Sequence, residues 1–174
     1  MQFTDFGIGG PAVFEISREA AFGGDQVLLL DLLRPMTEEN LCIYLTKKCS
    51  ILPDIPLEDY LTGILHNRLG RVVLKQAGFD LTRHADTLTD KEVQCIAHQI
   101  KFFPLTVVGV MGLEQAQVTA GGIKTSEFRP DTLESRLCPG LFATGEVLDI
   151  DGDCGGYNLQ WAWSSGRLAG KLGK

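Results

Sequence analysis

Helical patterns dominate the middle of the chain. Thr37 is placed to cap a helix over residues 38–48, and a longer helix is expected to begin near Pro56. Apolar residues then recur at helical spacing (Leu61, Ile64, Leu65, Leu69 and Val72 or Val73). These patterns predict two successive helices, one over residues 38–48 and a longer one from about Pro56 through Val72 or Val73.

The helix after Thr89 has the clearest signals. The spacing Thr89-x-x-Glu92 is that of a capping box, in which each residue's side chain bonds the other's backbone N–H group. Pro104 is expected to end the segment, and one face of the helix is apolar (Val93, Ile96, Ala97, Ile100). We therefore predict that residues 37–103 form a compact helical unit flanked by strands.

Strand-like runs and two further helices surround this middle part. The runs are residues 26–33 before it and residues 105–110 and 115–119 after it. Helices are expected over residues 11–18 and 157–172. The predicted fold class is α+β, with a helical insertion in a mixed fold.

Composition narrows the class of protein. The 174 residues are 44% hydrophobic with a net charge of -6 and no apolar run of about 18 residues, which favours a globular chain over a membrane span. The negative net charge also argues against nonspecific binding to the phosphate backbone of nucleic acids. No secretory signal is recognisable, so a cytoplasmic location is expected. The five cysteines include no C-x-x-C pair, which favours reduced thiols (Cys42, Cys49, Cys95, Cys138, Cys154).

Near the N-terminus, a glycine-rich run matches the loose dinucleotide pattern G-x-G-x-x-[GA]. The run is Gly7-Ile8-Gly9-Gly10-Pro11-Ala12. The segment before it carries Thr4 and Asp5, where a buried parallel strand needs apolar residues. We interpret the run as a tight turn into a short helix.

Three aspartates near the C-terminus match part of a calcium-binding loop. Asp149, Asp151 and Asp153 have the spacing of the first, third and fifth positions of an EF-hand. The sixth position is Cys154 instead of glycine, and the twelfth is Gln160 instead of a carboxylate. No metal site is predicted.

The same region has the order strand, acid, glycine loop and helix. Residues 140–145 lead to Glu146, and the loop DGDCGGYN precedes the last predicted helix. The N–H groups at a helix N-terminus suit an electron-rich acceptor, such as a flavin carbonyl oxygen. A carboxylate suits hydrogen bonds from sugar-alcohol hydroxyls. By itself, the interpretation as a turn and a helix cap explains the pattern about as well.

Several motifs in the second half follow one another in a fixed order: Thr119-Ala120-Gly121-Gly122-Ile123, Thr132-Leu133-Glu134-Ser135-Arg136, Pro139-Gly140-Leu141-Phe142, Gly145-Glu146-Val147-Leu148-Asp149, Gly155-Gly156-Tyr157-Asn158-Leu159-Gln160 and Ser165-Gly166. In order and spacing they resemble a bacterial flavoprotein family. This family is often labelled NAD(P)/FAD-dependent oxidoreductase, aminoacetone oxidase-like or 3-dehydro-bile-acid reductase-like. Residues 4–11 resemble another family segment, with Asp5 and Gly9 where His and Ser are expected.

The resemblance implies an FAD-binding Rossmann half, an inserted β-barrel with a helical subdomain, and a return of the chain to the FAD domain. On this layout, residues 1–36 are part of the inserted β subdomain and residues 37–104 are the helical subdomain. Residues 105–123 are return strands of the barrel-like subdomain. Residues 124–174 are the C-terminal strand, loop and helix of the FAD-binding domain. The chain then resembles a C-terminal fragment without the segment that holds the FAD adenosine diphosphate.

The implied function is the C-terminal part of an FAD-dependent oxidoreductase, with NAD(P)H as electron donor. It would contribute the ribityl and isoalloxazine side of the flavin site. The resemblance implies cofactor-binding residues in two segments, residues 119–123 and residues 145–158. They are Gly121, Gly122, Gly145, Glu146, Gly155, Gly156, Tyr157 and Asn158. We expect residues 119–123 and 146–158 to meet on one face of the molecule.

No catalytic residue is assigned, because no Cys, His or Tyr has the partner spacing of a nucleophile or general base. The alternative is a noncatalytic fragment or interaction domain that binds no cofactor alone. On either hypothesis the isolated chain is expected to be colourless and inactive. We also expect it to pair with an N-terminal FAD-binding half or to self-associate.

Overall fold

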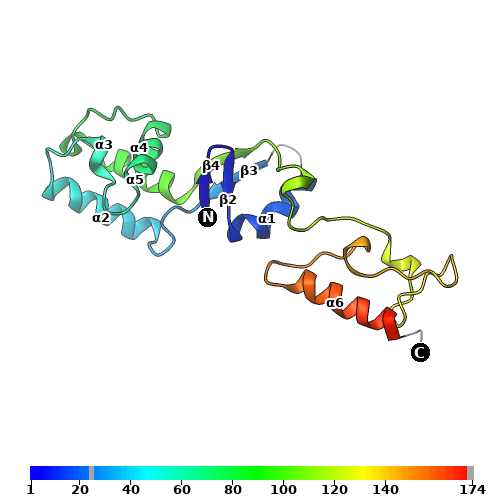
Figure 1. The fold of residues 1–174 in the computed structure, drawn as a ribbon. Coiled ribbons are helices and arrows are strands. Elements are labelled where there is room, and N and C mark those ends of the chain that lie inside the picture. The colour runs from blue at the N-terminus through cyan, green and yellow to red at the C-terminus, as the bar shows by residue number, and fades with distance from the viewer. Residues whose placement is uncertain (24–25, 172–174) are drawn as a thin grey trace. The chain divides into compact units, whose positions relative to one another are not determined.

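The computed structural model describes residues 1–23 and 26–171. The chain divides into two compact units, one of which is Asp25–Val107. The other combines Met1–Gly24 with Val108–Lys174. Figure 1 traces the elements of both units along the chain.

Helices α2 to α5 form the helical part of the unit Asp25–Val107. They are α2 (Glu38–Ile51), α3 (Leu57–Tyr60), α4 (Asn67–Gln76) and α5 (Asp90–Lys101), and they gather into one group in Figure 1. Their inward-facing side chains are fully buried (Leu41, Leu45, Leu57, Tyr60, Val73, Leu74, Ile96, Ile100). Burial of each aliphatic side chain stabilises the fold by about 1.5–3 kcal/mol. The prediction of a helical middle is therefore confirmed.

The N-terminal cap of α2 is also as predicted. The Thr37 side chain accepts a hydrogen bond from the Asn40 N–H group at 3.2 Å. The single long helix expected after Pro56 is wrong, because the chain turns at Gly63, whose φ of +95° does not continue a right-handed helix. Helix α4 begins only after His66, whose Nδ1 accepts from the Arg68 N–H group at 3.3 Å.

A two-stranded antiparallel sheet closes this unit. Strand β3 (Gln26–Leu30) pairs with β4 (Phe103–Val107), and Leu30 lies opposite Phe103. Both of these side chains are buried. The strand expected over residues 105–110 therefore begins and ends earlier. Helix α5 ends before Pro104 as expected, and Pro104 itself lies inside β4.

The strand expected over residues 26–33 ends at Leu30 because a lysine holds the next residues in a turn. Lys101 Nζ donates to Asp31 Oδ2 at 2.6 Å, to the Leu33 carbonyl at 3.2 Å and to the Met36 carbonyl at 2.6 Å. The ammonium group thus joins the end of α5 to the turn after β3.

The N-terminal part of the other unit is a hairpin followed by a helix. Strands β1 (Gln2–Thr4) and β2 (Gly7–Gly9) are antiparallel, and α1 (Pro11–Phe22) follows with Pro11 as its first residue. The interpretation of the glycine-rich run as a turn into a helix is confirmed, although the helix is longer than expected.

The C-terminal part of that unit packs on a small core. Helix α6 (Tyr157–Gly170) lies near the C-terminus (Figure 1), and its predicted end at residue 172 falls outside the described residues. Trp161 and Leu168 of α6 pack against four buried residues (Phe128, Leu133, Ala143, Leu148). The strand expected over residues 115–119 is wrong, because these residues are exposed and pair with no strand in the described structure.

Among the residues that the structure describes, the strands form two two-stranded sheets and no barrel. The chain is therefore a mixed α and β protein with small sheets, and the barrel-like subdomain is not confirmed. Residues 140–144 make only an isolated bridge, Glu134 to Phe142, instead of a strand. Within residues 1–23 and 26–171, no helix is both long and apolar enough to cross a membrane.

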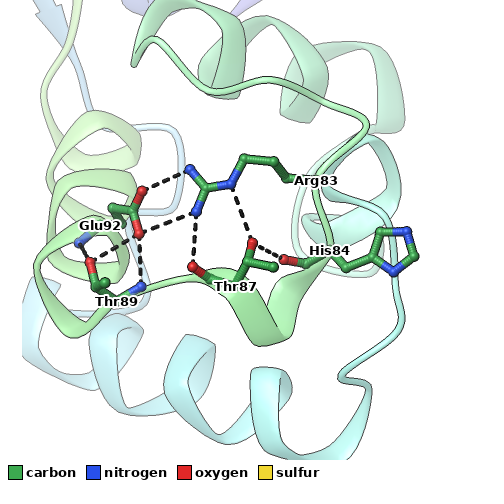
Figure 2. Close-up of polar contacts among 5 residues, drawn as sticks. All are labelled: Arg83, His84, Thr87, Thr89 and Glu92. Carbon is green, nitrogen blue, oxygen red and sulfur yellow. Dashed lines mark hydrogen bonds and ion pairs between the residues drawn. The ribbon is translucent and has the colours of Figure 1, made fainter.

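A polar network fixes the start of α5 (Figure 2). The Thr89 N–H group donates to Glu92 Oε2 at 2.8 Å, and the Glu92 N–H group donates to Thr89 Oγ1 at 3.3 Å, so the capping box is confirmed. Arg83 donates to Glu92 Oε1 at 2.8 Å and to the Thr87 carbonyl at 2.9 Å. The Arg83 hydrogen bond, followed by those from Thr89, lowers the pKa of Glu92 from 4.5 to about 2.

Replacing this carboxylate should change the acid stability of the helical unit. Because folding lowers the pKa of Glu92, the ionised group stabilises the fold above its ordinary pKa of 4.5, and this is lost as the pH falls toward 2. Between these pH values, the free energy of unfolding should fall less steeply for Glu92→Gln than for the wild type. At pH 7 the variant should be less stable by about 1–2 kcal/mol.

Urea unfolding at a series of pH values measures both effects. Asp90→Asn is the control, because Asp90 lies in the same first turn but its side chain makes no hydrogen bond or ion pair with described residues. If the free energy of unfolding depends on pH equally steeply in Glu92→Gln and the wild type, the stabilising role assigned to the ionised Glu92 is contradicted.

Candidate functional site

A hollow of about 140 Å³ lies beside the first turns of α6. One wall comes from Gln117 and Val118, and the other comes from Glu146 and residues in and before the helix (Ile150, Asn158, Leu159, Trp161, Ala162). Pockets that enclose a drug-sized ligand usually measure about 300–1,000 Å³. The hollow therefore has room for part of such a ligand.

The backbone at Gly122 lies directly against the backbone of residues 147–149. The Ile123 N–H group donates to the Val147 carbonyl at 2.9 Å, and the Asp149 N–H group donates to the Ile123 carbonyl at 2.9 Å. A Cβ added at Gly122 would lie 2.7 Å from the Val147 carbonyl oxygen and 2.8 Å from the Asp149 nitrogen. Only glycine allows this contact without a shift of the backbone.

Thr119 and Glu146 make a second contact between the same segments. Both the N–H group and the hydroxyl of Thr119 donate to Glu146 Oε1, at 2.5 Å and 3.0 Å. The prediction that residues 119–123 and 146–158 meet in space is therefore confirmed. Thr119 was not among the predicted site residues, although it begins the motif that contains Gly121 and Gly122.

Gly145 ties the turn that carries Glu146 to α6. Its N–H group donates to Ser165 Oγ at 2.9 Å, and its carbonyl accepts from Trp161 Nε1 at 3.1 Å. Gly145 and Ser165 are both buried, and Gly145 has a φ of +70°. Trp161 and Ser165 were also missed by the sequence prediction. In the motifs quoted from the sequence, Ser165 was present in Ser165-Gly166, but Trp161 was not part of any motif.

The predicted residues at the start of α6 fall into two groups. Asn158 closes the glycine loop, because its Oδ1 accepts from the Gly152 N–H group at 2.8 Å and its Nδ2 donates to the Gly152 carbonyl at 2.9 Å. Gly155, Gly156 and Tyr157 are exposed, and Gly156 caps α6 without a side-chain hydrogen bond. The first N–H groups of the helix thus have no capping side chain.

The three aspartates of the partial EF-hand pattern do not gather around a point. Asp151 accepts from Arg18 of α1, with Nε 2.6 Å from Oδ2 and Nη2 3.4 Å from Oδ1. This ion pair links α1 to the glycine loop, a role that the sequence did not predict. Across the described residues, no group of three or more His, Cys, Asp or Glu side chains is placed to hold a metal ion. The five cysteines are free thiols.

Comparison with known proteins shows the family of this chain. Residues 36–172 match the family model described as HI0933-like protein Rossmann domain. Over 98% of its length the chain is 38% identical to the 3-dehydro-bile acid delta(4,6)-reductase of Clostridium scindens. Over 94% of its length it is 34% identical to the ribosomal RNA dihydrouridine synthases of Escherichia coli and Haemophilus influenzae.

The chain covers 43% of the reductase and 39% of each synthase, so it spans about two fifths of the length of these curated relatives. The matched residues include both glycine-rich segments around the hollow. The resemblance to a family with 3-dehydro-bile-acid reductase-like members, drawn from the sequence motifs, is thereby confirmed. The chain belongs to the HI0933-like protein Rossmann domain family.

Proposed function

We propose that this chain supplies the ribityl and isoalloxazine side of a flavin site in an FAD-dependent oxidoreductase, with NAD(P)H as electron donor. The observation that carries the proposal is the hollow beside α6, where the Glu146 carboxylate and the uncapped start of the helix lie together. A bound flavin would supply the hydride chemistry, and the chain would supply position and electrostatics.

The residues present fit one end of the cofactor. Glu146 Oε1 accepts the two Thr119 donors, and Oε2 accepts no hydrogen bond from any residue that the structure describes. A carboxylate oxygen of this kind suits a ribityl hydroxyl. The first N–H groups of α6 suit a ring carbonyl oxygen, because a helix N-terminus carries partial positive charge. Gly121, Gly155 and Gly156 place no side chain in the way.

The diphosphate end of FAD has no comparable site in the described part of the chain. Diphosphate binding in Rossmann folds uses a glycine turn between a buried parallel strand and a helix. Here α1 follows the antiparallel pair β1 and β2. We propose that an N-terminal FAD-binding half, or self-association, completes the site. Leu159 and Trp163, which are 60% and 68% exposed, offer apolar surface for that contact.

The alternative function is a noncatalytic interaction domain that binds no cofactor alone. The small volume of the hollow favours it, because a partial set of hydrogen bonds of about 1 kcal/mol each must offset the cost of association. The two functions differ in whether isolated flavin fragments bind at the hollow.

The names of the relatives describe different substrates. One relative is named as a reductase of a 3-dehydro-bile acid, and two are named as dihydrouridine synthases of ribosomal RNA. Our proposal for this chain therefore extends to the reaction class, oxidoreduction, and assigns no substrate. The expectation from the net charge of -6 that nucleic acid is not a partner stays a prediction.

Flavin titration distinguishes the two functions. Riboflavin, FMN and FAD should each bind with a similar Kd, on the order of 0.1–1 mM, because the chain contacts the part that all three share. The chain should be colourless as purified. Isothermal titration or flavin fluorescence measures the three constants. No binding by any flavin would support the noncatalytic alternative. A Kd for FAD tenfold or more below that for riboflavin would contradict the assignment to the ribityl end.

A methyl group at position 122 should separate the two glycine-rich segments. In Gly122→Ala, the new Cβ must move the backbone of residues 147–149, which destabilises this packing by about 1–3 kcal/mol and should abolish riboflavin binding. Gly140→Ala is the matched control, because Gly140 also has a positive φ of +81° and open space at the Cβ position but is not one of the predicted cofactor-binding residues. Thermal unfolding and riboflavin titration of both variants provide the comparison. If both variants lose stability and riboflavin binding equally, backbone strain at the positive φ is responsible instead of the close contact at Gly122.

A further inference from the structure

The segment from Leu113 to Thr119, here called the strap, contributes Gln117 and Val118 to the lining of the hollow. All of its residues are exposed. Within the described structure, its backbone hydrogen bonds are the local ones from Gln115 to the Gly112 carbonyl and from Ala116 to the Leu113 carbonyl. Its two longer-range bonds both run from Thr119 to Glu146.

We propose that Thr119 and Glu146 form a clamp that holds the strap against the hollow and orients the carboxylate for a ligand hydroxyl. Thr119 is the positioning residue, and Glu146 is the ligand contact. The evidence for the clamp itself is the pair of hydrogen bonds from Thr119 to Glu146, which form without a ligand. The ligand class, a sugar alcohol such as the ribityl chain of a flavin, rests on the proposed function.

The chemistry of the carboxylate explains why one oxygen is sufficient for the clamp. Each carboxylate oxygen has two lone pairs, and the two Thr119 donors meet at Oε1. Hydrogen bonds to a charged acceptor are roughly twice as strong as neutral ones. Two donors at one oxygen also restrict rotation of the side chain, so less rotamer freedom is lost when a ligand binds at Oε2.

The two sides of the clamp are anchored differently. The turn that carries Glu146 is joined to α6 by the hydrogen bonds of Gly145 to Ser165 and Trp161. Among the residues that the structure describes, the strap has no equivalent anchor before Ile123, which bonds to residues 147 and 149. Breaking the clamp should therefore displace the strap, with Gln117 and Val118, and leave the Glu146 turn in place.

Hydrogen exchange of single amides, followed by NMR on the full chain, tests the clamp without any ligand. In the wild type, the Thr119 amide should be protected, whereas those of Gln117 and Val118 should exchange freely. Glu146→Ala should accelerate exchange at Thr119 about tenfold or more, the factor that corresponds to about 1.4 kcal/mol. Thr119→Val, which removes only the hydroxyl donor, should give a smaller acceleration, and Thr119→Ser should restore wild-type exchange.

Two control variants leave the clamp intact. Glu114→Ala removes another carboxylate from the strap, and Thr125→Val removes a hydroxyl from a nearby turn. Neither side chain makes a hydrogen bond to the described residues. Protection of the Gly145 amide, which bonds to Ser165, reports that each variant is folded. Unprotected Thr119 in the wild type, or exchange that Glu146→Ala does not change, would overturn the clamp.

Riboflavin is the probe for the ligand part of the proposal. At saturating concentration it should slow exchange at Thr119 further in the wild type and leave exchange unchanged in Glu146→Ala. A protected Thr119 amide that riboflavin does not affect would overturn the ligand assignment and the proposed flavin function, while the clamp would stand. The two failures are thus distinguishable.

Discussion

The candidate site depends on one close approach of backbone to backbone. At Gly122 the chain lies against residues 147–149 at distances that exclude a Cβ atom. This contact sets the register between Ile123 and Leu148, and through it the distance from Thr119 to Glu146. The two walls of the hollow take their relative positions from this pair of backbone segments, while the hydrogen bonds of Gly145 fix the Glu146 turn against α6. A methyl group at position 122 therefore acts on the contact between the two walls.

The two units are stabilised in different ways. The helical unit buries a continuous set of large apolar side chains and fixes its helix ends with side-chain caps at Thr37, His66 and Thr89. The C-terminal part of the other unit has a core of four buried residues, with large apolar side chains such as Trp163 exposed. The helical unit therefore has the larger apolar core.

Local signals in the sequence were predictive where the interacting groups are close in the chain. The capping box at Thr89 and Glu92 joins residues three positions apart, and the buried face of α5 follows from helical spacing. The break at Gly63 was missed, because the apolar spacing continues through it while the backbone turns. The run 115–119 has strand composition, but no neighbouring strand among the described residues pairs with it.

Contacts at the site were predictable only at the level of whole segments. The motifs indicated that residues 119–123 and 146–158 meet, but no spacing rule pairs Thr119 with Glu146 or Arg18 with Asp151, which are 27 and 133 positions apart. Asn158 shows the same limit. Its motif indicated a role near the cofactor, and no spacing rule predicts that its amide group also closes the loop at Gly152.

The pairing of Gln26 with Val107 has a consequence for how this architecture tolerates change. Because these residues lie opposite each other in register, the helical unit starts and finishes at neighbouring points. The helical unit therefore joins residues that precede β3 to residues that follow β4 in the same way as a hairpin loop joins two paired strands. The cost of closing such a connection grows only slowly with its length. Insertions, deletions or exchange of the intervening helices can therefore accumulate in evolution with little effect on residues 108–171, provided that the β3–β4 ladder is retained.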